Sequence, residues 1–360
     1  MMPIKHDDKT MPNFSSVEKN SVYKFNDYVH TVNLNGERCK KECYEFPERI
    51  TVEYGDVSIE NYKGIVKMPK EFVGGLNTLF IKNANVHELP EVLDVRKTCC
   101  IEKTCVEYLP KTMSVGGDLN IEDTPFKSWP NTLNVGGDLF VLGPRDLPLP
   151  KHLSVGGRFL YSHSNVDSLP DKMYVGDTLD LGESTIKRIP STLKVGKRLI
   201  LDNTSIEEWT GEFISEGELR YVFSDIKSMP ERIVVGDLSF DGSNVDVMPS
   251  ELVVNGTASF NFATIKSWPK KMIVKGNLGL YKATADRFPE ISEVGGSLDL
   301  RKSNIKELPD NLTIGGDLIL SGKLSKFPSG LKVKGNFKHN GYYSDNELPD
   351  DLEVGGEIIG

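Results

Sequence analysis

Prolines recur along this chain at intervals of 19 to 22 residues, and this spacing restricts the fold more than any other feature. The series runs from Pro47 to Pro349, with Thr210 in one expected position, and a large apolar residue precedes each member. A fixed period of about 20 residues is typical of repeat proteins, in which one unit is too small to bury its own apolar side chains. The period therefore predicts one continuous stack of coils.

The pattern inside each repeat indicates short strands. The unit reads L-P-x-x-L-x-V-G-G-x-L-x-L-x-x-T-x-I-x-x, and pairs such as Leu298 and Leu300 alternate with polar residues, as on a strand with one buried face. Proline and glycine interrupt every coil, which leaves no uninterrupted helical window. We therefore expect a mostly β solenoid of about sixteen 20-residue coils, with short parallel strands and little helix.

Two recurring polar features have structural explanations. The glycine pair, such as Gly315-Gly316, is expected to form a corner with positive φ. Asp118, Asp138 and Asp317 occupy the next repeat position, where an aspartate can accept hydrogen bonds from turn amides. Because these aspartates recur in register, we interpret them as structural and not as a calcium ladder.

The segment with Leu119, Ile121, Thr124, Phe126 and Trp129-Pro130 resembles the bacterial-type leucine-rich repeat L-x-V-x-x-N-x-L-x-x-L-P. The resemblance covers about residues 47–360 and implies a leucine-rich-repeat-like, right-handed solenoid that recognises proteins on the concave face of its sheet. Such repeats occur in bacterial effectors and in uncharacterised phage and gut-bacterial proteins. Some of these effectors carry a ubiquitin-ligase domain with a catalytic cysteine, but no cysteine follows Cys105 here, so that activity is not carried over.

Two departures from the family pattern bear on the fold. The family's asparagine is usually replaced by threonine, serine or alanine, as at Thr124, Ser184 and Ala263; the hydroxyls can still bond the backbone of a neighbouring coil. The V-G-G segment also adds one residue before the strand. Two short strands per coil are then possible, so a plain parallel β-solenoid is the alternative fold.

Composition and the chain ends suggest a domain plan and a compartment. Residues 1–20 read as a flexible polar tail, 21–46 as an N-terminal cap and 47–360 as the solenoid. The N-terminus has no apolar signal region, and no stretch of the sequence has the length of a membrane span. We expect a cytoplasmic protein, or alternatively a virion protein. The net charge of −9 argues against a nucleic-acid partner.

The search for catalytic or metal-binding groups returns no candidate site. Cys39 and Cys43, with His30 nearby, have a spacing compatible with zinc, but no second ligand pair follows. Cys99 aligns with the inward leucines, whereas Cys100 and Cys105 are expected to point outward without a catalytic partner. We therefore predict no catalytic residue, no metal, no cofactor and no enzymatic activity.

Large apolar side chains at outward positions are the candidates for a binding face, because such residues are rare on a sheet surface unless something covers them. Two irregular coils, 141–148 and 209–215, fall in the same region. The alternative is an apolar stripe covered by a loop of the chain itself. The proposed protein-binding residues are Phe140, Leu142, Leu160, Ile200, Val222, Phe223, Phe262 and Tyr281.

These observations favour a non-enzymatic protein-binding scaffold, an intracellular effector or inhibitor that engages a protein partner through the sheet face. The alternative is a structural component of a larger assembly such as a phage virion. The last coil ends at Ile358 and Ile359, and an uncovered strand edge invites pairing with another chain. We expect a docking edge there, which would allow self-association; fraying of the last residues is the alternative.

Overall fold

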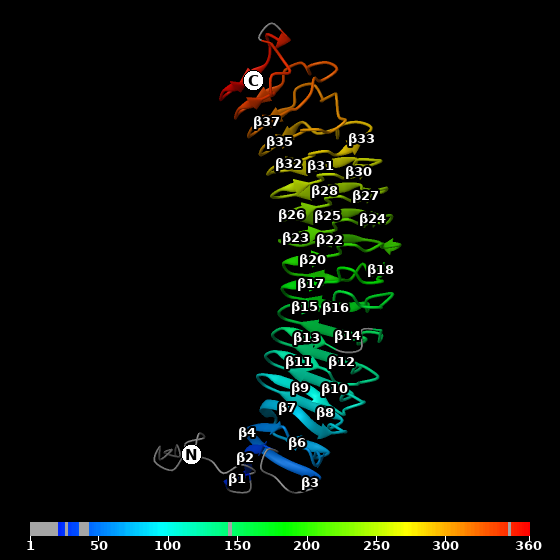
Figure 1. The fold of residues 1–360 in the computed structure, drawn as a ribbon, viewed down its shortest axis with the longest axis vertical. Helices are drawn as coiled ribbons and strands as arrows, with labels where there is room; N and C mark the ends of the chain where they lie inside the picture. Colours follow the sequence, from blue (N-terminus) through cyan, green and yellow to red (C-terminus); the bar gives the residue numbers. More distant parts are fainter. Residues whose placement is uncertain (1–20, 26–27, 36–42, 143–145, 345–346) are drawn as a thin grey trace, which may run out of the picture. The chain divides into compact units, whose positions relative to one another are not determined.

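The computed structural model describes residues 21–25, 28–35, 43–142, 146–344 and 347–360. Over these residues the chain forms a parallel β-solenoid whose coils follow the 20-residue repeat, with no α-helix among them (Figure 1). The expected solenoid class is thereby confirmed. The predicted tail at 1–20 and Cys39 lie outside the described residues, and no helix of membrane-spanning length and hydrophobicity occurs in the described part.

The chain divides into two compact units. Unit 1 comprises Met1–Val135 with Phe140–Pro144, and unit 2 comprises Gly136–Leu139 with Arg145–Gly360. One strand, β13 (Leu139–Leu142), contributes residues to both.

Unit 1 opens with an antiparallel pair, β1 (Ser21–Phe25) and β2 (Tyr28–Asn35), and β2 then pairs in parallel with β4. The assignment of 21–46 as a cap stays a prediction. From β9 to β11 the register advances by one repeat, with Cys99 opposite Leu119 and Ile101 opposite Ile121. The further strands of unit 1 are β3 (Cys43–Glu45), β4 (Arg49–Glu60), β5 (Ile65–Lys67), β6 (Glu71–Val73), β7 (Leu76–Val86), β8 (Val92–Val95), β9 (Cys99–Thr104), β10 (Thr112–Val115), β11 (Leu119–Glu122) and β12 (Thr132–Val135).

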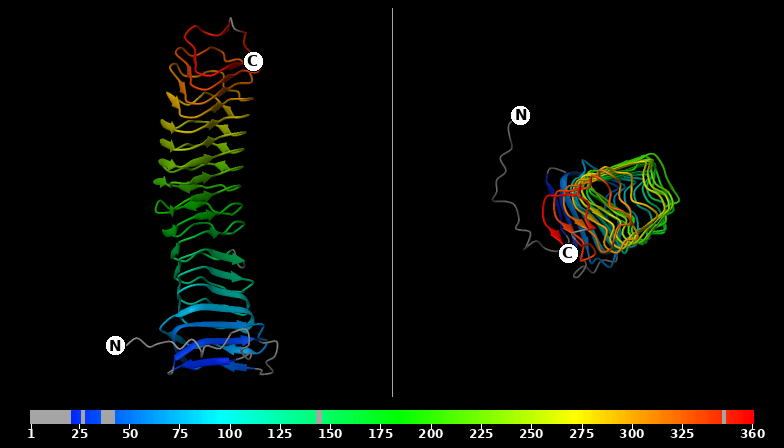
Figure 2. Two further views of the ribbon diagram at one scale, coloured as in Figure 1. Left: turned by 90° about the vertical axis from the view of Figure 1, so that its left-hand side faces the viewer. Right: turned by 90° about the horizontal axis from the view of Figure 1, so that it is seen from above.

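Unit 2 repeats the same coil, and its strands stack in successive layers from green to red in Figure 2. The first series, the L-x-L strands, comprises β15 (Phe159–Leu160), β17 (Thr178–Asp180), β20 (Arg198–Ile200), β23 (Glu218–Arg220), β26 (Asp237–Ser239), β29 (Ala258–Ser259), β32 (Leu278–Gly279), β35 (Leu298–Asp299), β37 (Leu318–Ile319), β39 (Phe337–Lys338) and β41 (Ile358–Ile359).

A second series of strands precedes the glycine or glycine pair of each coil. Each coil therefore carries two short strands, as the additional residue of the V-G-G segment made possible. Its members are β14 (His152–Val155), β16 (Lys172–Val175), β19 (Lys194–Val195), β22 (Glu212–Ile214), β25 (Arg232–Val235), β28 (Glu251–Val254), β31 (Lys271–Val274), β34 (Glu293–Val294), β36 (Thr313–Ile314), β38 (Lys332–Val333) and β40 (Glu353–Val354). A shorter third group comprises β18 (Arg188–Ile189), β21 (Glu208–Trp209), β24 (Asp225–Ile226), β27 (Asn244–Val245), β30 (Thr264–Ile265) and β33 (Thr284–Ala285).

The core is the column of inward residues that the repeat predicts. Leu199 and Leu201 of one coil are both fully buried, as are Ile233 and Val235 of the second series. Leu298 and Leu300, from which the inward register was inferred, are also buried. Each coil therefore buries its apolar residues against its neighbours, as the size of a single unit requires.

The glycine pair has a different role from the one expected. Gly315 and Gly316 are not among the residues with positive φ. Instead, a Cβ placed on Gly315 would lie 2.0 Å from the carbonyl oxygen of Gly295 in the preceding coil. The expectation of a positive-φ corner was therefore wrong at Gly315-Gly316, where the backbone of the preceding coil leaves no room for a Cβ. It is confirmed at the pair Gly74-Gly75, whose φ angles are 96° and 79°.

Hydroxyl groups that replace the family's asparagine bond neighbouring coils at some positions, as expected, but not at Ser164 and Ser184, whose buried hydroxyls have no hydrogen-bond partner among the described residues. The Ser224 hydroxyl donates to the Leu201 carbonyl at 3.2 Å and accepts the Thr204 amide at 3.1 Å, and Ser243 repeats this arrangement with Tyr221 and Ser224. These bonds join neighbouring coils inside the solenoid and satisfy buried polar groups.

The aspartates after the glycine pair also bind backbone amides, as expected, but those of the next coil. Asp138 accepts the Arg158 amide at 2.7 Å, and Asp317 accepts the Asn336 amide at the same distance. Nearby cations, Arg158 and Lys338 respectively, lower the pKa of each carboxyl. The recurring aspartates therefore hold the coils in register.

Candidate functional site

A row of residues with positive φ follows the L-x-L strands of unit 2, one in each of the eight successive coils from β15 to β35. Positive φ suits glycine and asparagine but is costly for bulky side chains, because Cβ crowds the backbone. We call this set the corner row: His163, Glu183, Asn203, Phe223, Gly242, Phe262, Lys282 and Lys302. Two of its members are phenylalanines, which are poorly suited to this backbone conformation.

Phe223 is the most exposed large apolar side chain among the residues with described side chains, at 69%. Its φ is 52°, and its ring lies against the next member of the row. A Cβ on Gly242 would be 2.5 Å from the Cδ1 and Cε1 atoms of this ring. Gly242, with a φ of 66°, therefore meets two demands at once: the left-handed backbone and the space for the phenyl ring.

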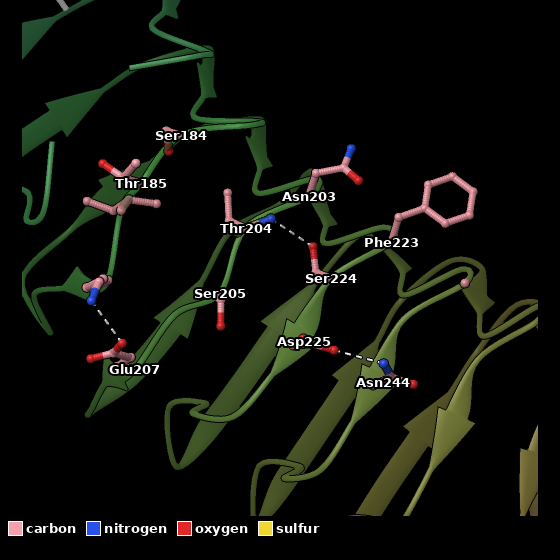
Figure 3. Close-up of a pocket in the computed structure, with 13 residues that line it drawn as sticks. Ser184, Thr185, Asn203, Thr204, Ser205, Glu207, Phe223, Ser224, Asp225 and Asn244 are labelled. Atoms are coloured by element: carbon pink, nitrogen blue, oxygen red, sulfur yellow. Dashed lines mark hydrogen bonds and ion pairs between the residues drawn. The ribbon is translucent and has the colours of Figure 1, made fainter. Parts of the chain in front are cut away.

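A shallow groove lies beside Phe223, on the same side of unit 2 as the corner row. Figure 3 shows a polar floor and Phe223 at one border, with its ring directed away from that floor. In the floor, the Thr204 amide donates to the Ser224 hydroxyl, and the Asn244 side chain donates to Asp225 at 2.8 Å. The lining residues are Ser184, Thr185, Ile186, Lys187, Asn203, Thr204, Ser205, Glu207, Phe223, Ser224, Asp225, Gly242 and Asn244.

The chemistry of the groove suits recognition more than catalysis. Hydroxyl, amide and carboxylate groups offer both donors and acceptors, and Lys187 and Glu207 form an exposed ion pair of 3.2 Å. Together with a flat apolar ring at the border, such a surface can hydrogen-bond a backbone and pack one apolar side chain.

The structure also brings together Phe262 and Tyr281. Their ring centroids are 5.3 Å apart in an edge-to-face arrangement, and Phe262 is 54% exposed at a φ of 61°. The Lys282 ammonium lies 5.1 Å from the centroid of the Phe262 ring. These two predicted residues therefore form one aromatic cluster with a cation on it.

Other predicted binding residues are more scattered. Leu160 is exposed and Ile200 half-buried on the L-x-L strands, but Asp180 lies between them in the ladder. Phe140 is half-buried and Leu142 exposed, and both belong to unit 1. The predicted residues therefore do not form one continuous apolar stripe within unit 2.

Val222 was expected to point outward, and this was wrong: it is only 6% exposed. Strand β23 ends at Arg220, so the alternation of inward and outward residues no longer holds two positions later. Instead, the Val222 amide donates to Asp202 at 3.0 Å, and the chain turns at Phe223.

At the last coil, Ile358 and Ile359 form β41, which pairs with β39. Their side chains are 47% and 40% exposed. The exposure is compatible with the predicted docking edge, whose occupant stays a prediction.

The described cysteines do not form a reactive centre. Cys99 is buried, and burial raises the pKa of its thiol. Cys100, expected to point outward, is buried as well, beside Lys82 and Glu102, so that expectation was wrong; burial raises its pKa too. Among the residues with described side chains, no group of three or more histidine, cysteine, aspartate or glutamate side chains is placed to hold a metal ion.

Sequence reasoning missed the corner row as a unit. Phe223 and Phe262 were singled out as outward residues of the sheet, but both lie one residue past the alternating positions. The available signal was alignment: both phenylalanines fall in the repeat column that holds Asn203 and Gly242, residues that commonly adopt positive φ.

Comparison with known proteins adds little to this picture. No family profile matches the sequence, and no curated protein matches it. Among solved structures, the chain is similar to YopM from Yersinia enterocolitica WA-314, with 14% identity over 92% of this chain and 89% of that one. The TM-score of 0.27 is too low for this likeness to carry weight. The fold assignment therefore depends on the strand pairing itself.

Proposed function

We propose that this protein is a non-enzymatic binding scaffold that engages another protein through the corner row and groove of unit 2. The observation that carries the proposal is the pair of exposed phenylalanines, Phe223 and Phe262, held at positive φ. A strained backbone conformation costs stability and such outliers cluster at functional sites, while exposed apolar side chains that lie together mark interaction surfaces.

The surroundings of Phe223 support this proposal. Binding energy at protein interfaces concentrates in a few aromatic or arginine anchors surrounded by polar contacts. Phe223 supplies such an anchor, and the hydroxyl and amide groups of the groove supply hydrogen-bonding partners around it. In keeping with the leucine-rich-repeat resemblance, we place the protein in the cytoplasm as an effector or inhibitor.

The exposed isoleucines of β41 support a second candidate, a structural component of a larger assembly such as a virion. In that role the last coil would dock on another chain. The two candidates use different surfaces, so they can be tested separately.

The test of the binding proposal compares two charge substitutions on exposed aromatic residues. Phe223→Asp removes the anchor, and Tyr174→Asp makes the same change on an exposed residue of β16, in the second series. Immobilised protein is used to capture partners from bacterial and animal cell lysates, and each captured protein is then purified for affinity measurement.

We expect Phe223→Asp to raise the dissociation constant by about tenfold or more, as loss of an anchor residue does. Tyr174→Asp should leave the dissociation constant unchanged. Both variants should keep the wild-type circular dichroism spectrum. Equal affinity of all three proteins would refute the proposed face.

A further inference from the structure

A compact group of cations surrounds the ring of Tyr281. The Lys282 ammonium lies 5.6 Å from the ring centroid, the Arg301 guanidinium carbon 5.5 Å and the Lys302 ammonium 5.8 Å. Phe262 contacts the same tyrosine edge to face. We call these five residues the aromatic–cation cluster; they come from three successive coils of unit 2.

The charge of this cluster is only partly balanced. The Arg301 guanidinium donates three hydrogen bonds to the Asp299 carboxylate, of 2.9, 3.1 and 2.6 Å. Among the ion pairs between described residues, neither Lys282 nor Lys302 has a carboxylate partner. Three cations and one carboxylate leave two positive charges unmatched, on a chain whose net charge is −9.

We propose that the aromatic–cation cluster binds an acidic peptide segment of the partner, one that places an aromatic or aliphatic side chain on Phe262 and carboxylates on Lys282 and Lys302. This inference depends on the proposed function and names the chemistry of the partner. The two lysines without carboxylate partners favour binding of carboxylates, because complementary charges at an interface speed association and set orientation. The exposed ring beside them calls for an apolar group.

The spacing of the coils fits such a segment. Lys282 and Lys302 belong to adjacent coils, whose strands are about 4.8 Å apart. Carboxylates two residues apart on an extended peptide are about 6.6 Å apart, within the reach of two flexible lysine side chains. One short acidic run can therefore meet both lysines while its neighbour packs on Phe262.

The surroundings disfavour a nucleic acid. Affinity for a phosphate backbone requires a track of cations. The preceding coils instead carry carboxylates near this border of the sheet, at Asp241, Asp202 and Glu183, and Arg220 beside them is paired with Asp202. In the later coils, Lys323 and Lys338 are already paired with Glu347 and Asp317. A phosphate chain would therefore run out of unpaired cations after about two coils, whereas a short acidic peptide needs no more than these.

The experiment selects peptides from a displayed library of random dodecapeptides on the purified full-length protein. We expect enrichment of peptides that combine two or more acidic residues with a neighbouring aromatic or aliphatic residue. The variant Lys282→Glu with Lys302→Glu should weaken binding of the selected peptides by about tenfold or more. The matched control, Lys275→Glu with Lys326→Glu, makes the same charge change at exposed lysines outside the cluster and should keep their affinity.

Several outcomes overturn the proposal. Enrichment of neutral or basic peptides would do so, as would acidic peptides that bind the Lys282/Lys302 variant as tightly as the wild type. Oligothymidine that binds more tightly than the selected peptides, and loses affinity in that variant, would assign the cluster to nucleic acid. If a captured partner is lost with Phe223→Asp but binds the Lys282/Lys302 variant normally, the proposed function stands and only this inference fails.

Discussion

The positive φ of Phe223 should lower the stability of the folded protein, while the contact of its ring with Gly242 should raise it. Two substitutions can separate these two effects. Phe223→Ala removes the ring but keeps a Cβ at a φ of 52°, whereas Phe223→Gly removes both. A non-glycine residue at positive φ is strained by about 1–2 kcal/mol, and replacing it with glycine relieves this strain. Glycine also lowers stability by roughly 0.5–1 kcal/mol relative to alanine, because its unfolded chain has more conformational entropy to lose. The glycine variant should therefore be about 0.5–1 kcal/mol more stable than the alanine variant.

The contact between the Phe223 ring and Gly242 determines how stable both variants are relative to the wild type. Phe223 is 69% exposed, so its ring buries only about a third of the surface that a core phenylalanine would. Full burial of such a side chain stabilises by about 1.5–3 kcal/mol, so the contact over Gly242 contributes roughly 0.5–1 kcal/mol. Phe223→Ala should lose that amount, and Phe223→Gly should lie within about 0.5 kcal/mol of the wild type.

Urea unfolding, monitored by far-UV circular dichroism, measures the free energy of unfolding of the wild type and the two variants in the same buffer. The same two variants should lose partner binding to a similar extent, since both lack the ring. An alanine variant that equals or exceeds the glycine variant in stability would refute the strain at Phe223, and with it the main physical reason for assigning the corner row to function.

Three other predictions test the core, the coil register and the last coil. Leu199→Ala or Leu300→Ala should lower the free energy of unfolding by about 2–5 kcal/mol, because both side chains are buried; a loss below about 0.5 kcal/mol would contradict the inward register. Asp317→Asn keeps an oxygen for the Asn336 amide but removes the charge that faces Lys338, which should cost about 0.5–1 kcal/mol at neutral pH. Because the folded-state pKa of Asp317 lies below its ordinary value of 3.8, its stabilisation is present above that pH and is lost as the pH falls below it; the variant and the wild type should converge in acid, and a constant difference would contradict this. Ile358→Lys with Ile359→Lys should shift an oligomer to monomer in light scattering with little change in melting temperature, whereas an unchanged mass and unchanged partner binding would reject the docking edge.

The sequence was sufficient for the solenoid and its core because both follow from local periodicity. Pairs such as Leu298 and Leu300 show the inward positions of each coil, and Ser224 behaves as its repeat position predicts. The contacts between coils were harder to foresee. Whether Gly315 serves backbone geometry or close approach depends on how far apart successive coils lie, which no single repeat reveals.

The candidate site was predicted only in part, for a related reason. Phe223, Phe262 and Tyr281 were identified by their size at outward positions. The alternation rule fails where the strand ends, so it misplaced Val222 and did not show that Phe223 and Phe262 share one column with Gly242. The lysines around Tyr281 come from different coils, and charges on separate repeats become a cluster only when the coils are stacked.

The central claim, that a protein partner binds at the corner row and groove of unit 2, is tested most directly by amide hydrogen exchange on the complex with a captured partner. Binding there predicts slower exchange in segments 202–206, 221–226, 240–245, 260–265 and 281–285, which contain five members of the corner row and part of the groove floor. The second-series strands of the same coils, β22, β25, β28 and β31, should be unaffected. Protection confined to those second-series strands, with none in the five segments, would contradict it.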